Sequence, residues 1–258
     1  MKYIRGFLMA WGMFCWIPCP YRGWREEDRR AQIGTLPMVG LFIGGILCVI
    51  WHFISMLPSL GYIMGGTLLT GAYFLMTGFI HLDGFMDCSD AIMPRHPSME
   101  ERRRILKDSH SGAFAVICLV LMLMIFGASV SELYMADEKV LFPVILCILT
   151  CSRAVSAVSV LACRPMSTSQ YSETGAKATD CILPIVITVI TLCACVFASG
   201  LREGAGYVIA VSLITVAASG ITGAYDRKKL GGMNGDISGH MITMSEMTGI
   251  AAAAVLIL

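Results

Sequence analysis

Hydrophobic and polar residues are arranged along this chain in long blocks rather than in the mixed pattern of a soluble domain. Apolar runs long enough to cross a bilayer, roughly 20 residues each, are separated by short polar segments. The stretch at 3–19 is apolar but shorter and contains Arg5, so we expect a retained interfacial or re-entrant helix there. The pattern predicts an all-α, polytopic integral membrane protein with about seven transmembrane helices, near 37–57, 60–80, 112–131, 140–162, 181–200, 206–225 and 237–258.

Composition supports this prediction. The chain is 56% hydrophobic and 14% charged, whereas soluble domains contain about 25% charged residues. Most of the 11 cysteines fall within apolar runs, where cysteine behaves as a small hydrophobic residue, so they do not indicate a disulfide framework. No basic patch is interleaved with aromatic residues, which argues against nucleic acid as a partner. We predict one membrane-embedded domain over 1–258, with the lipid bilayer as its surroundings and an oligomer left open.

Basic residues are distributed unevenly between the two sides of the predicted bundle. If the loops alternate across the bilayer, 16 of the 19 Lys and Arg residues fall on one side, and only Lys139 and Arg202 fall on the other. Cytoplasmic loops carry such an excess, so the crowded side is predicted to be cytoplasmic. That side comprises the N-terminal segment and the loops at 20–36, 81–111, 163–180 and 226–236.

The most distinctive polar segment follows the second predicted span. Asp83, Asp87 and Asp90 are spaced by four and three residues, which places them on one face if the helix continues. Carboxylates crowded near a membrane repel one another, and Mg²⁺ or Mn²⁺ removes that repulsion through oxygen ligands. Gly84 permits close approach to the backbone. The alternative is a solvated helix end with three surface acids.

Two further motifs lie on the same predicted side or within a span. Ser109 or Ser111 is placed to cap the next span, so that its N-terminus, together with Lys107, suits a phosphate. The alternative is an ordinary cap with a snorkelling lysine.

Arg153 lies near the middle of a span, where a charge either lines a polar cavity or pairs with Glu246 or the acidic cluster.

A glycine-containing loop precedes the last span. Its sequence is GGMNGD at 231–236, and the glycines allow the backbone to approach a ligand closely at Asn234 and Gly235. Asp236 either adds a carboxylate to the metal site or caps the last helix.

Acids, basic residues and helix N-termini on one side of the membrane predict a site for a metal-bound diphosphate. Because no GxxxxGK[ST] motif is present, the substrate's own diphosphate is expected to supply the energy.

These motifs resemble those of the membrane-bound adenosylcobinamide-GDP ribazoletransferases, the cobalamin synthases. HLDGFMDCSD at 81–90 followed by KDSHSG at 107–112 carries most of the resemblance. This chain differs in having Ala91 where the family usually has glycine and Asn234 where it usually has threonine. Further similar segments are 14–20, 37–45, 153, 164–165 and 231–236.

The resemblance implies a Mg²⁺-dependent transferase of the bacterial cytoplasmic membrane with a cytoplasmic site. Adenosylcobinamide-GDP and α-ribazole, or its 5′-phosphate, would be the substrates, and GMP and adenosylcobalamin or its phosphate the products. Asp83, Asp87 and Asp90 would hold the metal, with Asp108 and Asp236 as further candidates. The proton acceptor would be His81 or one of the carboxylates. The expected substrate-binding residues are Lys107, Ser109, Arg153, Arg164, Asn234 and Gly235.

Two other functions fit parts of the pattern. A CDP-alcohol phosphatidyltransferase would use the same metal chemistry, but its DxxDGxxAR…GxxxDxxxD pattern is absent. A transporter would also place Asp, Glu and Arg within the membrane. The polar residues of this chain gather on one side instead of forming a relay across the bilayer, which favours the enzyme.

Overall fold

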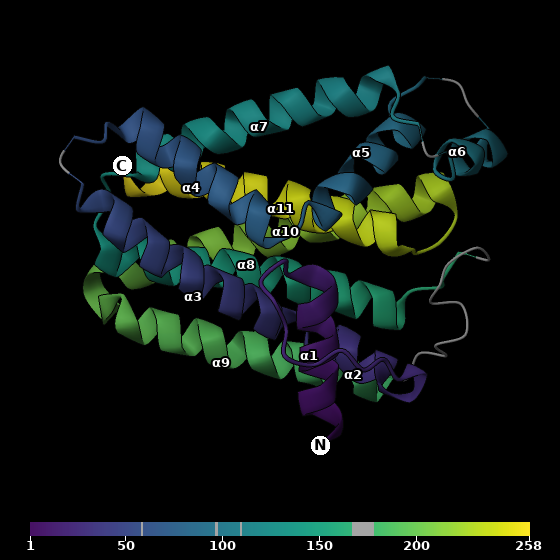
Figure 1. Ribbon diagram of the computed structural model, residues 1–258, viewed down its shortest axis with the longest axis horizontal. Coiled ribbons are helices and arrows are strands. Elements are labelled where there is room, and N and C mark those ends of the chain that lie inside the picture. The colour runs from purple at the N-terminus through teal and green to yellow at the C-terminus, as the bar shows by residue number, and fades with distance from the viewer. Residues whose placement is uncertain (58, 96–97, 109, 167–177) are drawn as a thin grey trace.

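A computed structural model describes residues 1–57, 59–95, 98–108, 110–166 and 178–258, and helices dominate them (Figure 1). The predicted all-α class is confirmed. The α-helices are α1 (Lys2–Phe14), α2 (Arg29–Gly34), α3 (Leu36–Ser55), α4 (Tyr62–Met76), α5 (Ile80–Ile92), α6 (Met99–Ile105), α7 (Ala113–Leu133), α8 (Glu138–Ala162), α9 (Ile182–Ala198), α10 (Ala205–Leu230) and α11 (Gly235–Ile257). Short turns of other helix types lie at Glu26–Asp28, Ala178–Cys181 and Gly200–Gly204.

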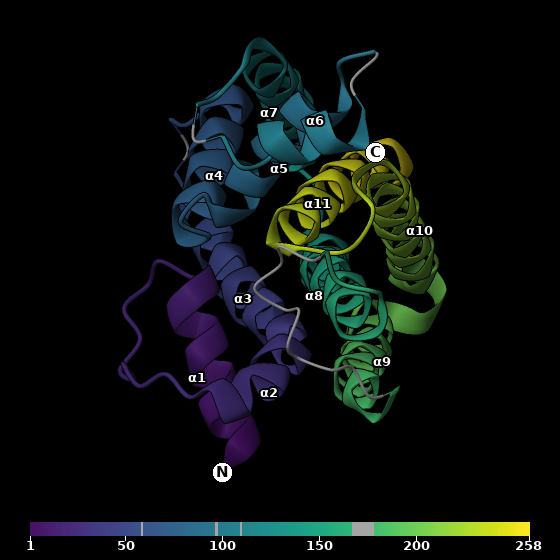
Figure 2. The ribbon, with the colours of Figure 1, turned by 90° about the vertical axis from the view of Figure 1, so that its right-hand side faces the viewer.

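The predicted spans correspond to the long helices of the bundle. Among the described residues, six helices are long and apolar enough to cross a membrane, and α4 with α5 makes a seventh candidate that is bent by 90°. Helix α8 is the most buried, with 78% of its apolar window inside the protein, against 22% for the window that includes α9. Figure 2 shows α8 surrounded by α3, α9, α10 and α11. The core therefore forms around α8, while α7 and α9 present apolar side chains outward.

The second predicted span does not continue into the acidic segment as one helix. Helix α4 ends at Met76, and Gly78 and Phe79 both adopt left-handed backbone conformations, with φ of 59° and 60°. A left-handed conformation is uncommon for a residue other than glycine, and at Phe79 it is costly unless the surrounding structure fixes it. The chain turns sharply there, so α5 runs across the polar end of the bundle instead of along α4.

Residues 81–111 were expected to form a polar loop, and the structure corrects this. Most of the segment is helical, in α5 and α6. Ser98 and Glu101 form a reciprocal capping box at the start of α6, with hydrogen bonds of 3.2 Å and 2.7 Å. A capping box satisfies two backbone N–H groups that a helix end otherwise leaves free. Asp83, Asp87 and Asp90 lie in α5, so they belong to a helix and not to a loop.

The N-terminal helix is not among the candidate spans, in keeping with the predicted interfacial or re-entrant helix. In Figure 1, α1 lies crosswise to α3. Arg5 Nε donates a 2.6 Å hydrogen bond to Asp28 Oδ2, which ties α1 to the segment before α2.

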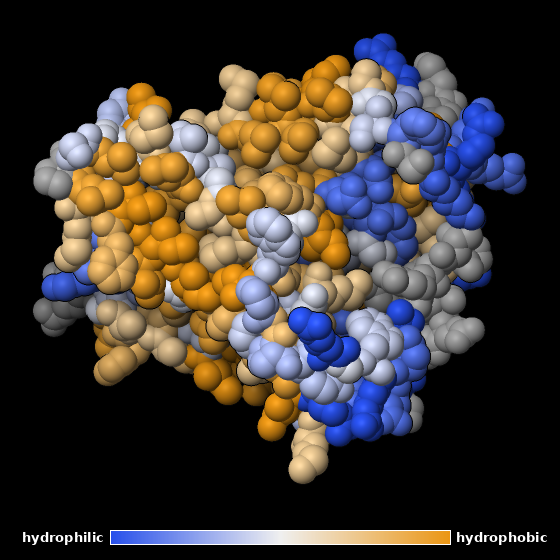
Figure 3. Space-filling model, in the orientation of Figure 1, coloured by the Kyte–Doolittle hydropathy of each residue, from blue (hydrophilic) through white to orange (hydrophobic). Residues whose placement is uncertain are grey.

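Figure 3 shows apolar residues over much of the bundle and polar residues gathered at the end that holds α2, α5 and α6. One end of the protein is therefore distinctly polar.

Candidate functional site

The acidic residues of α5 face the N-terminus of α11. Gly84 makes this approach close, because a Cβ atom built there would lie 2.7 Å from the backbone oxygen of Asp236. Side chains larger than hydrogen cannot fit at that distance without separating the two helices. Asp83 and Asp87 of α5 are thereby brought beside Asp236 of α11. We call Asp83, Asp87 and Asp236 the acid cluster.

Mutual repulsion is evident at Asp87, which lies on α5, outside the six long spanning helices. Partial burial, followed by the charges of Asp83, Asp236 and Asp90, raises the pKa of Asp87 to about 6. A carboxyl group with this environment gains from a nearby cation. The donors are carboxylate oxygens, which are the ligands that Mg²⁺ and Mn²⁺ prefer. The donor chemistry of the acid cluster is therefore of the kind that a hard divalent cation prefers.

Asp90 has a different environment from the other acids of α5. One carboxylate oxygen accepts a hydrogen bond from the Gly112 backbone N–H at 2.5 Å, and the other accepts one from Ala115 at 2.9 Å. Asp90 therefore caps the N-terminus of α7, where a negative charge is favoured by the helix dipole. Its two oxygens are engaged in holding α5 and α7 together.

This cap bears on the expectation for the start of α7. We expected Ser109 or Ser111 to cap the helix, but among the described residues the helix begins after Gly112, and Asp90 supplies the acceptor. Ser109 lies outside the described residues. The amides expected to receive a substrate phosphate are partly occupied by a protein carboxylate. Sequence spacing missed this because the cap comes from a residue 22 positions earlier.

Lys107 and Asp108 are exposed before α7. Asp108 Oδ1 accepts hydrogen bonds from the His110 backbone N–H at 3.0 Å and makes a 2.7 Å contact with its ring. These interactions hold the pKa of Asp108 below its usual value. Asp108 is not among the charges that raise the pKa of Asp87, so the structure does not group it with the acid cluster. Lys107 remains a predicted phosphate ligand.

The loop before α11 is held in place from two directions. The Met166 backbone N–H donates to the Met233 carbonyl at 2.9 Å, and the Met233 N–H donates to the Arg164 carbonyl at 2.9 Å. Arg103 of α6 donates to the Leu230 carbonyl at 2.8 Å. These contacts bring Arg164, whose side chain is exposed, to the loop that precedes Asp236.

Asn234 decides between the two alternatives left open for Asp236. Its Oδ1 accepts the Ile237 backbone N–H at 3.0 Å and so caps α11. Its Nδ2 donates to Asp236 Oδ2 at 2.6 Å. Because Asn234 is the cap, Asp236 does not have that role, and its charge acts on Asp87 of α5. Gly235 begins α11 immediately after the cap.

Arg153 forms the pairing with Glu246 that the sequence left as an alternative. Its side chain is fully buried and makes an ion pair with Glu246. Tyr73 also donates to Glu246, and Ser152 Oγ donates to it at 2.6 Å. These partners join α4, α8 and α11 inside the bundle. Binding of a phosphate by Arg153 stays a prediction, and the geometry favours a structural role.

His81 is buried between α5 and its neighbours. Its ring stacks on Phe14 at a centroid distance of 5.8 Å, and Thr243 Oγ1 donates to its backbone oxygen at 3.1 Å. Its Nε2 has no hydrogen-bond partner within the part of the chain that the structure describes. The side chain therefore packs against α1, whereas Asp83 on the same helix is exposed.

The N-terminal segment lines two cavities, one of which also borders α5. One, of about 430 Å³, is lined by Asp83, Gly78 and Trp16, and the other, of about 620 Å³, by Trp16, Tyr21 and Trp24 among others. Trp16 is 70% exposed and borders both. Residues 14–20 are similar to the family in sequence, but no functional role was predicted for them. Its aromatic and proline content was the available signal.

Comparisons with known proteins agree with the motifs. The sequence profile of the family described as "Cobalamin-5-phosphate synthase" matches residues 6–254. Proteins named "Adenosylcobinamide-GDP ribazoletransferase" are similar over nearly their whole length. That of Clostridium botulinum (strain Alaska E43 / Type E3) is 32% identical, with 96% of each chain covered. That of Lachnoclostridium phytofermentans is 30% identical, with 97% of this chain and 94% of the relative covered. No solved structure matches the chain.

Proposed function

The chain belongs to the cobalamin-5-phosphate synthase family of transferases, and we propose that it joins adenosylcobinamide-GDP to α-ribazole or α-ribazole 5′-phosphate. The ribose 5′-hydroxyl attacks the phosphorus attached to the cobinamide arm. A new P–O bond forms, the bridging P–O bond of the diphosphate breaks, and GMP leaves with the bonding electrons. The products are GMP and adenosylcobalamin or its 5′-phosphate.

The observation that carries this proposal is the acid cluster at the polar end of a membrane bundle. It lies next to the cavity that Asp83 and Trp16 line, so a diphosphate at the cluster has space for the rest of a substrate beside it. Trp16, Tyr21 and Trp24 offer aromatic faces for a planar base. The alternative functions, CDP-alcohol transfer and transport, gain no support from the family match.

We assign Mg²⁺ to Asp83, Asp87 and Asp236. Bound there, the ion would neutralise charge on the diphosphate oxygens and stabilise the leaving phosphate. The assignment is supported by the oxygen donors and by the partial burial and neighbouring carboxylates that raise the pKa of Asp87. Asp90 acts by fixing α5 against α7.

The remaining steps are assigned to groups of this chain. Arg164 and Lys107, both exposed at the polar end, bind phosphate oxygens through charge-assisted hydrogen bonds. Asn234 and Gly235 place the N-terminus of α11 at the diphosphate, where backbone N–H groups favour an anion. The hydroxyl proton passes to a carboxylate of the site, since the His81 ring packs on Phe14 within the protein.

Turnover by the purified protein tests this proposal. With Mg²⁺, adenosylcobinamide-GDP and α-ribazole should yield GMP and adenosylcobalamin in equal amounts. Omitting either substrate should abolish GMP release. Release of CMP from a CDP-alcohol, with no reaction of adenosylcobinamide-GDP, would instead identify a phosphatidyltransferase.

We propose that the polar end faces the bacterial cytoplasm, on the basis of the unequal distribution of basic residues. In intact cells, a membrane-impermeant maleimide should label Met135→Cys, in the exposed turn between α7 and α8. The same reagent should label Arg104→Cys, in α6, only after permeabilisation. The native cysteines make the unsubstituted protein the background control. The reverse labelling pattern would invert the topology.

Gly84→Ala tests the contact between α5 and α11. The added methyl group would lie 2.7 Å from the Asp236 backbone oxygen, so the helices must move apart and the acid cluster must widen. A shift near 1 Å at a reacting site lowers rates by up to about 10²-fold, and we expect a loss of at least about tenfold. Gly71→Ala on α4 is the matched control, because nothing lies within 4 Å of its Cβ position. Equal activity of the two variants would contradict the assigned contact.

A further inference from the structure

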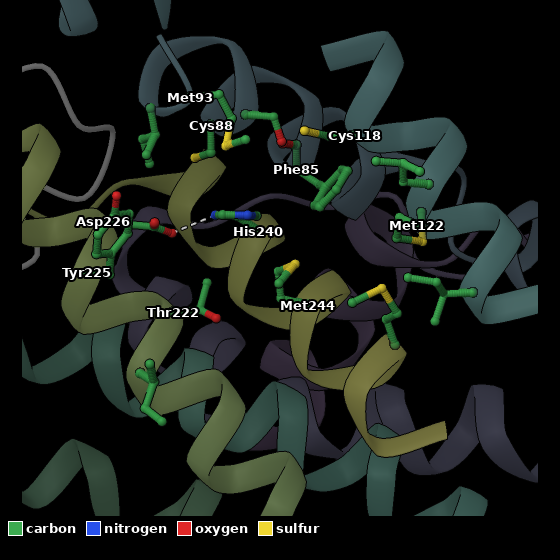
Figure 4. A pocket seen from close by; sticks show the side chains of 16 residues that line it. Phe85, Cys88, Met93, Cys118, Met122, Thr222, Tyr225, Asp226, His240 and Met244 are labelled. Carbon is green, nitrogen blue, oxygen red and sulfur yellow. Dashed lines mark hydrogen bonds and ion pairs between the residues drawn. The ribbon is translucent and has the colours of Figure 1, made fainter. Parts of the chain in front are cut away.

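A second group of metal-ligating side chains lies apart from the acid cluster, on another face of α5. Cys88 of α5, Asp226 of α10 and His240 of α11 each offer a ligand atom, and these atoms lie within 4.8 Å of one another. Figure 4 shows the three residues beside a cavity, with Asp226 and His240 pointing toward each other. Three separate helices thus contribute to one small group of sulfur, oxygen and nitrogen donors.

The cavity next to this group has a volume of about 390 Å³ and is mainly apolar. Its lining includes Phe85, Met122 and Met244, and also the exposed side chains of Ile221 and Tyr225. The exposed members place its opening on the lateral face of the bundle, between α10 and α7.

One carboxylate oxygen of Asp226 is buried and lacks a hydrogen-bond partner among the described residues. The residue has no exposed surface. Its Oδ2 contacts His240 Nδ1 at 2.7 Å, but its Oδ1 has no hydrogen-bond partner in the described part of the chain and is screened from solvent. A buried carboxylate oxygen without a partner is costly, and such groups are normally bonded or coordinated to a metal.

The donor types favour a particular class of ion. A thiolate and an imidazole are preferred by Zn²⁺ and similar transition metals, whereas Mg²⁺ prefers oxygen alone. One thiolate, one carboxylate and a neutral imidazole together balance the charge of a divalent ion. A neutral site is important here because Cys88 and Asp226 are both fully buried.

We propose that Cys88, Asp226 and His240 bind a zinc-like divalent cation at a site distinct from the acid cluster. His240 Nδ1 and Asp226 Oδ2 lie 2.7 Å apart, so two of the three ligand groups are already side by side. Three protein ligands leave a fourth position for water or a small ligand from the cavity. Because Cys88 follows Asp87 directly, the ion would also tie this part of α5 to α10 and α11.

Co²⁺ substitution provides the test, since a thiolate bound to Co²⁺ gives a near-ultraviolet charge-transfer band. The purified full-length protein is titrated with Co²⁺ in excess Mg²⁺, which keeps the oxygen-only acid cluster filled. We expect the band to saturate near one Co²⁺ per chain, and Zn²⁺ to abolish it by competition. Cys88→Ser should remove the band, and His240→Gln or Asp226→Asn should weaken Co²⁺ binding by at least about tenfold.

Cys118→Ser is the matched control. Cys118 lines the same cavity but is not one of the three residues, so its replacement should leave the spectrum and affinity unchanged. Size-exclusion elution and thermal unfolding of each metal-free variant separate loss of a ligand from loss of folding. Absence of a thiolate band in the folded wild-type protein would overturn the proposal and leave Asp226 and His240 as an ion pair alone. Persistence of the band in Cys88→Ser would also overturn it.

Discussion

Asp83→Asn and Asp87→Asn should each lower GMP release from adenosylcobinamide-GDP by about 10²-fold or more. Each substitution keeps the shape of the side chain but removes a negative charge from the acid cluster, so the cation is held less tightly. The loss should be accompanied by a higher Mg²⁺ requirement in the variants that retain measurable activity. The measurement is the initial rate as a function of Mg²⁺ concentration.

Asp108→Asn is the matched control for these variants. Asp108 is an exposed carboxylate near the same end of the protein, and it contacts His110. We expect it to change the Mg²⁺ requirement little. If Asp83→Asn and Asp87→Asn both had wild-type rates at wild-type Mg²⁺ concentrations, the acids of α5 would be a solvated helix face, and the metal assignment would fail.

Arg153→Ala should destabilise the protein severely. The substitution leaves Glu246 buried without its cationic partner, and breaking a buried ion pair costs about 3–5 kcal/mol. We expect a large fall in thermal stability in detergent and little folded protein. Arg153→Lys should recover only part of the loss, because an ammonium group cannot reproduce the planar hydrogen bonding of a guanidinium.

The double variant Arg153→Met with Glu246→Gln separates pairing from phosphate binding. It removes both charges from the buried network, so it should be more stable than Arg153→Ala. Substantial activity in this double variant is expected if Arg153 only supports the fold. A folded double variant with no activity and a greatly raised Km for adenosylcobinamide-GDP would instead show that Arg153 binds the substrate. Arg104→Ala, at an exposed position of α6, is the control for a change of charge alone.

The long apolar runs allowed the transmembrane helices to be predicted because membrane spans are determined by length and hydropathy. The break between α4 and α5 was not predictable in the same way. Phe79 has a left-handed backbone, a conformation that its residue type does not indicate. The sequence therefore placed the acids on one helical face, but it did not indicate that α5 is bent by 90° from α4.

Spacing along one helix identified Asp83 and Asp87, but it could not separate them from Asp90. That distinction depends on the N-terminus of α7, which lies far away in the sequence. Asp236 was recognised as a candidate, and its role became clear only once Asn234 was seen to cap α11. Similarly, the partner of Arg153 depended on how α8 and α11 pack. Local motifs predicted the chemistry, whereas tertiary contacts assigned the individual residues.

The central claim is that the acid cluster holds a divalent cation against the substrate diphosphate. Mn²⁺ bound to the purified protein, observed by pulsed electron paramagnetic resonance, tests this most directly. Adding adenosylcobinamide-GDP without α-ribazole should produce ³¹P couplings to the bound Mn²⁺, and Asp87→Asn should weaken both Mn²⁺ binding and these couplings. Bound Mn²⁺ that shows no ³¹P coupling with substrate present, or that is unaffected by Asp87→Asn, would contradict the account.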